Sequence, residues 1–249
     1  MPSAPKMMGR RVLGAAIIAL LVAVALIPRF ACSDDPRMQD VHFVKFAPDS
    51  PIEIKPAIVD IAATRGKTFT EIVESYHPYA AINGTFYAST FVPLGDILID
   101  GKLKVKGRYP NAFAVTDSGK WEFVRRKGKS FDWTGYRCAV AAGPRLIEDG
   151  VTDLDPIADG FTQMSLTIKA PRSGIGLTKS GALLLVVCKR DVSLVEFAAV
   201  MRKLGAVEAM NLDGGPASGL YCNGKTLVDA RLRMTNLLLV YKRGSGAAR

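Results

Sequence analysis

Short β-prone segments separated by turn residues dominate the chain after residue 40, and they limit the folds that it can adopt. These segments cover residues 41–46, 58–62, 95–99, 112–116, 121–124, 182–188 and 237–241. Turn sequences such as Asp100-Gly101 and Asp117-Ser118-Gly119 separate several of them. Ala182–Cys188 is apolar throughout, which is typical of a strand buried on both faces. We therefore expect an α+β fold with mixed, largely antiparallel sheets.

Two segments carry the sequence signature of a helix N-terminus. Thr68-Phe69-Thr70-Glu71 and Ser193-Leu194-Val195-Glu196 both match the capping box, in which a hydroxyl and a carboxylate bond to otherwise unpaired amides. Apolar residues then recur at helical spacing as far as Leu204, and Gly205 supplies a stop. Each predicted helix is followed by a short apolar strand that ends in Asn and a glycine turn. We expect few other helices, and a single domain.

The N-terminal segment differs from the rest of the chain. Basic residues precede an uncharged apolar run from Val12 to Ile27, which is the pattern of export signals and signal anchors. The run is slightly short for a membrane span. Cleavage after Ala31 would put Arg29 at the third residue before the cut, where signal peptidase prefers a small residue. We expect a signal peptide or signal anchor over residues 1–31 and a domain over residues 40–243. The domain would then be periplasmic or extracellular, either free or tethered to the cytoplasmic membrane.

Export changes the meaning of the basic composition. The formal charge of +10 falls to +6 without residues 1–31, because 29 Lys and Arg then face 23 Asp and Glu. The densest basic cluster, Arg125-Arg126-Lys127-Gly128-Lys129, is typical of a solvated hairpin loop. In an exported protein, anionic glycans, phosphosugars or lipid head groups are better partners than nucleic acid. The four cysteines have no zinc-finger spacing, so no metal and no cofactor is predicted, while disulfide pairing and oligomeric state stay open.

The strongest local signal for chemistry is Met210-Asn211-Leu212-Asp213-Gly214-Gly215-Pro216-Ala217-Ser218. Polar residues that end an apolar strand need partners, since an unpaired buried carboxylate costs several kcal/mol. Two glycines let the backbone approach a ligand and present amides to an anion. A plain tight turn with an Asx-type bond explains the residues equally well.

Two further groups of residues suit a phosphorylated sugar. Ala81-Ile82-Asn83-Gly84-Thr85-Phe86-Tyr87 combines an amide, a hydroxyl and two aromatic rings, although a hairpin turn with core anchors is an alternative. Arg145 and Arg172 stand beside glycine turns, and a guanidinium matches phosphate oxygens bidentately. A surface ion pair is an alternative role for either arginine. Histidine is scarce and no Gly-x-Ser-x-Gly elbow exists, so carboxylate or phosphate chemistry remains.

Taken in order, these segments resemble the phosphodiester glycosidase domain family. The matching pieces are residues 81–87, 142–150, 171–176, 204–206 and 211–215, and the likeness spans roughly residues 40–243. After the double glycine this chain has Pro216-Ala217-Ser218 in place of the small residues with Ser or Thr that are usual there. After the buried strand it has a short Lys189-Arg190-Asp191 in place of Gly-Arg and a longer loop.

The resemblance implies a glycosidase-type hydrolase that cleaves a sugar 1-phosphodiester. It makes Asp213 the catalytic residue, as nucleophile, base or stabiliser of an oxocarbenium-like transition state, with Asp96, Glu148 and Glu208 as candidates for a second carboxylate. The implied substrate-binding residues are Asn83, Gly84, Thr85, Arg145, Arg172, Asn211, Gly214, Gly215 and Ser218. Two alternatives remain: a non-catalytic glycan-binding module of an envelope or exopolysaccharide system, and a purely structural exported domain.

Overall fold

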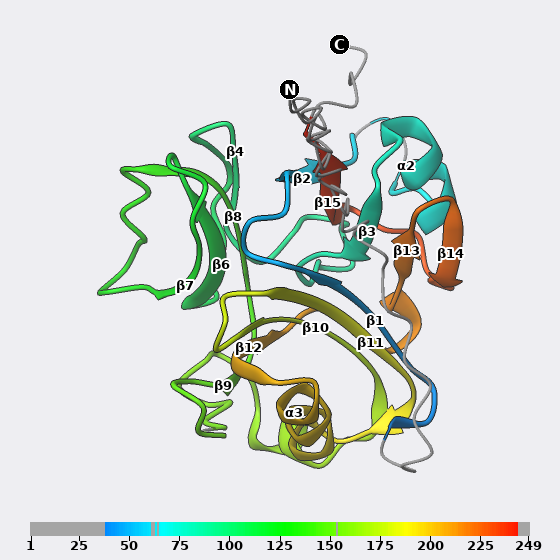
Figure 1. Cartoon of the computed structure of the whole chain (residues 1–249). Coiled ribbons are helices and arrows are strands. Elements are labelled where there is room, and N and C mark those ends of the chain that lie inside the picture. Colours follow the sequence, from blue (N-terminus) through cyan, green and yellow to red (C-terminus); the bar gives the residue numbers. More distant parts are fainter. Residues whose placement is uncertain (1–37, 61–62, 64, 153, 244–249) are drawn as a thin grey trace, which may run out of the picture.

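Three five-stranded sheets build the domain (Figure 1). The computed structural model describes residues 38–60, 63, 65–152 and 154–243, so the segment from Val12 to Ile27 lies outside the described part. Every strand pairing in the three sheets is antiparallel, and the described residues contain two α-helices with bounds assigned. The α+β prediction with largely antiparallel sheets and few helices is confirmed.

The first sheet carries α3 (Leu194–Lys203) on one face. Its strands, in spatial order, are β1 (Val41–Phe46), β11 (Leu183–Val192), β10 (Ala170–Thr178), β12 (Ala206–Asn211) and β9 (Arg145–Ile147). Residues 183–188 of β11 are all buried, as a strand covered on both faces requires. The capping box at Ser193 is present, and Gly205 follows the helix with φ of +92°. Both features confirm the helix bounds that the sequence indicated.

The second sheet carries α2 (Phe69–Tyr76), which begins at the capping box of Thr68. Its strands, in spatial order, are β14 (Lys225–Val228), β13 (Leu220–Cys222), β3 (Ala80–Asn83), β15 (Asn236–Lys242) and β2 (Ile52–Ile58). The prediction of a strand over 58–62 is wrong for its described part, because β2 ends at Ile58 and residues 59–60 are not in a strand, while residues 61–62 lie outside the described part. Pro56 hid its true position: β2 is an edge strand, where a proline is tolerated.

The third sheet has no helix among the described residues and is capped by aromatic side chains instead. Its strands, in spatial order, are β5 (Lys102–Val105), β4 (Ile97–Ile99), β8 (Tyr136–Ala142), β6 (Asn111–Thr116) and β7 (Trp121–Arg125). Because β6 lies between β7 and β8, the basic cluster at 125–129 belongs to a crossing loop and not to a hairpin.

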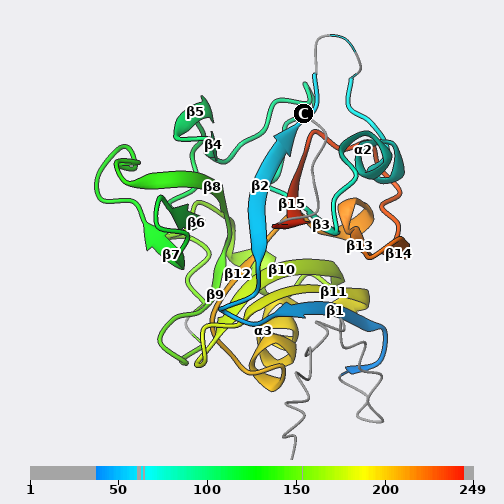
Figure 2. The ribbon, with the colours of Figure 1, turned by 45° about the horizontal axis from the view of Figure 1, so that its top comes forward.

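The inner faces of the three sheets enclose one apolar core. It includes Val44, Ile82, Phe113, Ile175 and Leu238, which come from all three sheets. The helices α2 and α3 cover the outer faces of the other two sheets, as both views show (Figure 2). Cys138 and Cys188 lie buried in strands with free thiols, as the sequence indicated, and Cys222 does too. In this arrangement the carboxyl ends of β3 and β12 lie close together, although the two strands belong to different sheets.

Candidate active site

The turn after β3 contacts the turn after β12, and each of these strands follows a helix that begins with a capping box. Asn83 is the last residue of β3, and Asn211 is the last residue of β12. The amide of Asp213 donates to the carbonyl of Gly84 at 3.1 Å. The side-chain amide of Asn83 donates to the carbonyl of Asp213 at 2.6 Å. Residues 130 positions apart in the chain therefore form one structure.

The other two segments of the resemblance join the same structure. The amide of Leu212 donates to the carbonyl of Ser173 at 2.8 Å, and that of Asn211 donates to the carbonyl of Pro144 at 3.0 Å. The side chain of Asn211 also donates to the carbonyl of Gly143 at 3.2 Å. Four motifs that are distant in sequence thus surround the turn at Asp213.

Asn83 and Asn211 hold this structure together. Both are buried, with 0% and 1% of their surface exposed. The side-chain oxygen of Asn83 accepts the amide of Gly219 at 3.1 Å while its nitrogen bonds to Asp213. The side-chain oxygen of Asn211 is buried with no partner among the described residues. Their role as sugar ligands stays a prediction, and their contacts assign them to positioning the loops.

Glycine is required at Gly214 and Gly84 because backbone and side chains approach closely. A Cβ on Gly214 would stand 2.9 Å from the carbonyl oxygen of Pro171, and one on Gly84 would overlap the side chain of Asn236. Asn236 brackets the next residue, with its oxygen accepting the amide of Thr85 at 2.7 Å and its nitrogen donating to the carbonyl of Thr85 at 3.0 Å. Gly215 has φ of +60°, a conformation that favours glycine.

Asp213 sits half-buried in this turn, and its environment changes its acidity. Burial raises the pKa of Asp213 to about 7, against the opposing effect of the Gly214 amide, which donates to Oδ1 at 2.9 Å. No charged side chain of the described residues enters among the causes of this pKa shift. A carboxyl group with a pKa near 7 can both release and accept a proton at neutral pH.

The charge of Asp213 affects the pKa of two tyrosines, Tyr87 and Tyr109. The sequence offered Tyr87 as one of two aromatic rings for sugar recognition but did not single out Tyr109. Burial raises the pKa of Tyr87 and of Tyr109, and the charge of Asp213 raises both further. The hydroxyl of Tyr87 donates to the carbonyl of Arg233 at 2.8 Å. Tyr109 stacks on Phe161 with ring centroids 4.8 Å apart. Tyr87 belongs to the motif at 81–87, but no local signal marks Tyr109 or Phe161.

Buried hydroxyl groups without partners belong to these same turns. The Oγ atoms of Ser173 and Ser218 and the Oγ1 atom of Thr85 are buried and make no hydrogen bond within the described residues. Unpaired buried polar atoms are rare in folded proteins, and those beside a site point to ligand recognition or strain. Thr85 and Ser218 were predicted as substrate-binding residues, and that role stays a prediction.

Arg145 is occupied by contacts within the protein. Its guanidinium pairs with Glu208, donates through Nε to the carbonyl of Ile147 at 3.0 Å, and lies 4.2 Å from the ring centroid of Phe123. Burial lowers the pKa of Arg145 to about 10. It lines a pocket of about 220 Å³ together with Arg125, Glu148, Asp155, Ala158 and Asp159, none of which belongs to the Asp213 turn.

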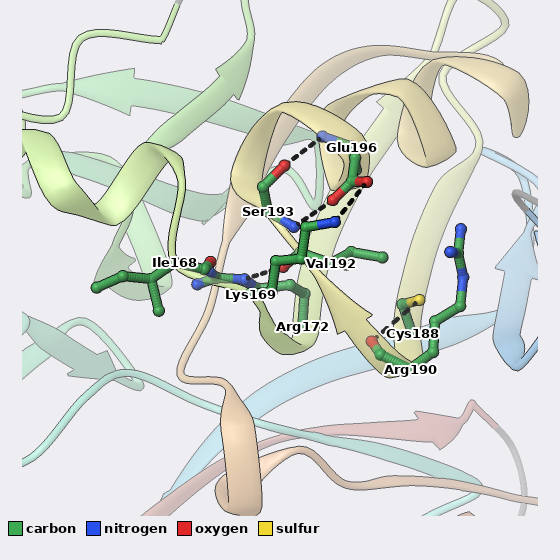
Figure 3. A network of polar contacts seen from close by, with 8 residues as sticks. All are labelled: Ile168, Lys169, Arg172, Cys188, Arg190, Val192, Ser193 and Glu196. Carbon is green, nitrogen blue, oxygen red and sulfur yellow. Dashed lines mark hydrogen bonds and ion pairs between the residues drawn. The ribbon is translucent and has the colours of Figure 1, made fainter.

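Arg172 lies nearer to the turn, but its guanidinium points to the start of α3 (Figure 3). Nε donates to the carbonyl of Val192 at 3.1 Å, and a terminal nitrogen donates to the carbonyl of Ile168. Its Cδ lies 3.9 Å from the place where a Cβ of Gly214 would stand, so the stem borders the double-glycine turn. Burial lowers the pKa of Arg172.

The three candidates for a second carboxylate have other partners or positions. Asp96 is buried, and its oxygens accept the amide of Gly107 at 2.7 Å and the indole of Trp133 at 3.0 Å. Glu208 pairs with Arg145 and accepts the amide of Asp149 at 2.9 Å. Glu148 is exposed at the separate pocket. Within the described residues, no group of three or more His, Cys, Asp or Glu side chains is arranged to hold a metal ion.

The fold and site define a β-rich domain in which Asp213, a carboxyl group with a pKa raised to about 7, lies where the turns after β3 and β12 meet. These turns contain Asn and Gly and belong to two different sheets. A family model described as phosphodiester glycosidase matches residues 76–241, which is more than half of the chain. The chain belongs to the phosphodiester glycosidase family.

Solved structures show the same fold at low sequence identity. The catalytic domain of zebrafish N-acetylglucosamine-1-phosphodiester alpha-N-acetylglucosaminidase, auto-inhibited by its pro-peptide, is 17% identical with a TM-score of 0.65, over 87% of each chain. A hypothetical protein from Synechocystis is 18% identical with a TM-score of 0.64, over 87% of this chain and 61% of that one. A putative exported protein from Burkholderia pseudomallei is 15% identical with a TM-score of 0.62, over 81% of this chain and 73% of that one. A comparison with curated proteins gives no match.

Proposed function

We propose that this protein is a hydrolase that cleaves a glycosyl-1-phosphodiester bond. The observation that carries the proposal is the position of Asp213, a half-buried carboxyl group where all four motifs meet, with a pKa raised to about 7 by burial. Membership of the phosphodiester glycosidase family supports the reaction class. The name of the zebrafish relative supports a phosphorylated sugar as the substrate class. The proposed substrate is a sugar cap on a phosphorylated glycan or a related envelope or exopolysaccharide molecule.

The reaction that we propose breaks the bond between the anomeric carbon and the phosphate oxygen. Water supplies a hydroxyl group to the sugar and a proton to the solution, and the products are a free sugar and a phosphate monoester. A phosphate is a good leaving group without protonation, so one carboxylate can serve. Asp213 would act as nucleophile, as base toward water, or as stabiliser of the positive charge at the anomeric carbon.

The residues around Asp213 suggest how the two halves of the substrate would bind. Thr85 and Ser218 bring buried hydroxyl groups without partners among the described residues to the turn. Gly215 has open space where a Cβ would stand, whereas Gly84 and Gly214 allow the close packing of the turn against Asn236 and Pro171. Asn83 and Asn211 would act chiefly by fixing these loops. The family resemblance implies that Arg145 and Arg172 hold the diester charge, and either would have to leave its present partners to do so.

Export of the domain is part of the proposal. The basic flank and apolar run up to Ile27 support it, and so does the likeness to the putative exported protein from Burkholderia pseudomallei. Among the helices described here, none has the length and apolar character needed to cross a membrane.

The test is hydrolysis of a panel of alkyl glycosyl-1-phosphodiesters that differ in the sugar. The purified protein should release free sugar from at least one diester. It should release none from the neutral alkyl glycoside of the same sugar, which is the matched control. Binding of a diester without sugar release would instead support the glycan-binding module, for which the stacked Tyr109 and Phe161 rings are the favouring observation. If the protein neither binds nor hydrolyses any diester of the panel, the remaining alternative is a purely structural domain.

A further inference from the structure

The segment from Lys106 to Tyr109 lies against the loops that carry the candidate site. The amide of Asp213 bonds to the carbonyl of Gly84 at 3.1 Å, and two residues further on the carbonyl of Phe86 accepts the amide of Leu94 at 2.8 Å. The carbonyl of Leu94 in turn accepts the amide of Arg108 at 2.8 Å. Three backbone bonds therefore connect Arg108 to the Asp213 turn.

The side chain of Asp96 holds this segment in place through a hydrogen bond to its backbone. Its Oδ1 accepts the amide of Gly107, and its Oδ2 accepts the indole of Trp133. Gly107 also packs so tightly on Leu94 and Gly95 that a Cβ would stand 2.3 Å from the carbonyl carbon of Gly95. Both carboxylate oxygens of Asp96 are therefore occupied by groups that hold this loop, and neither bonds to Asp213. Asp96 is a positioning residue for the loop that carries Arg108.

The guanidinium of Arg108 lies on the rim of the aromatic cluster beside the site. It stands 5.5 Å from the ring centroid of Tyr109, which is buried and stacked on Phe161, with Phe86 5.5 Å away. Arg108 itself is exposed, and no carboxylate of the described residues pairs with it. By contrast Arg145 pairs with Glu208, and Arg172 donates to two backbone carbonyls.

We propose that Arg108 binds the phosphate of the substrate, with Tyr109 and Phe161 holding its side chain at the rim of the site. The inference rests on the proposed function and deepens it, by naming the cation that selects a phosphodiester over a neutral glycoside. A guanidinium needs free donors to bind a phosphate bidentately. The side chain of Arg108 forms a hydrogen bond with Tyr109 and pairs with no carboxylate of the described residues, so further donors remain for a phosphate. The opposite effects of Arg108 and Asp213 on the pKa of Tyr109 support their placement around one phenol ring.

The test compares single variants of the full protein with two ligands. Arg108→Ala and Arg108→Lys are measured beside Arg202→Ala, which removes an exposed arginine from α3 and serves as the matched control. Isothermal titration gives the affinity for a glycosyl-1-phosphodiester and for the neutral alkyl glycoside of the same sugar. The hydrolysis assay gives kcat and KM for the diester.

We expect Arg108→Ala to weaken diester binding by about 10- to 100-fold, the range for a hydrogen bond to a charged group. KM should rise more than kcat falls, the affinity for the neutral glycoside should stay unchanged, and Arg108→Lys should recover only part of the loss. Arg202→Ala should behave as the wild type. Arg231, whose amide bonds to the carbonyl of Pro216, is the competing exposed arginine, and Arg231→Ala belongs in the same series.

Two results overturn the proposal. The first leaves the proposed function intact, and the second is a failure of that function. If the wild type hydrolyses a diester and Arg108→Ala matches Arg202→Ala, the phosphate is held elsewhere. A loss confined to Arg231→Ala, Arg172→Ala or Arg145→Ala in a folded protein would show where. If the wild type neither binds nor hydrolyses any diester, the proposed function fails and the role of Arg108 fails with it.

Discussion

Replacement of Asp213 by Asn should change turnover and stability in opposite directions: turnover should fall, and stability above pH 7 should rise. Asn is nearly isosteric but cannot act as base or nucleophile, so turnover should fall at least about 10²-fold. The wild-type rate should rise with pH as Asp213 loses its proton near pH 7, provided that the ionised form is the active one. The assay is sugar release from a diester between pH 5 and 9, with Asp117→Asn, an exposed turn residue, as the control.

The stability effect follows from the sign of the pKa shift. Asp213 in the folded protein holds its proton up to about pH 7, whereas its usual pKa is 3.8. Between about pH 4 and pH 7 the unfolded chain has lost a proton that the folded protein keeps, so stability falls as the pH rises. The change from 3.8 to about 7 corresponds to at most about 4 kcal/mol.

Partial exposure of Asp213 reduces this limit, and so does the weaker hydrogen bond that the Gly214 amide would make to the neutral Oδ1 of Asn. We expect Asp213→Asn to stabilise the protein by about 1–2 kcal/mol at pH 8, which is about 2–8 °C in Tm, and to bring no gain at pH 4. Thermal melts at both pH values, on the preparation used for kinetics, check this. Near-wild-type turnover in folded Asp213→Asn protein would remove the residue from the mechanism. A Tm difference that does not change with pH would refute the burial argument.

Three further predictions test the surroundings of Asp213 and the export of the domain. Arg172→Lys keeps the charge but loses the fork that reaches the carbonyls of Val192 and Ile168, so KM for a diester should rise if Arg172 touches phosphate; unchanged kinetics would leave it a loop-fixing residue. Gly214→Ala should lower both turnover and Tm, because its Cβ would stand 2.9 Å from the carbonyl oxygen of Pro171, and a variant with wild-type values would show that the turn adapts freely. A reporter fused after Arg249 that works only outside the cytoplasm should be active, and activity of a cytoplasm-only reporter would contradict export.

The sequence by itself determined most of the local structure. Capping boxes at Thr68 and Ser193 place two helices because a hydroxyl and a carboxylate satisfy amides within four residues. The uniform apolar run of β11 requires cover on both faces. The one strand that was misplaced, β2, contains Pro56, which is acceptable only because no strand of the described residues pairs with the outer edge of β2 through backbone hydrogen bonds. That edge position is a tertiary fact.

The tertiary structure alone decided which groups meet around Asp213. The contact between the turns of Asn83 and Asp213 joins two sheets, and no local pattern encodes such a contact. Tyr109 and Arg108 reach the site through Leu94 and Phe86, and Asp96 serves Gly107, although the sequence offered it as a second carboxylate. Periodicity and capping depend on neighbours within a few residues. Burial, pairing and pKa depend on atoms that only the packed chain brings together. For that reason the raised pKa of Asp213, and the lack of a carboxylate partner for Arg108 among the described residues, appear only in the fold.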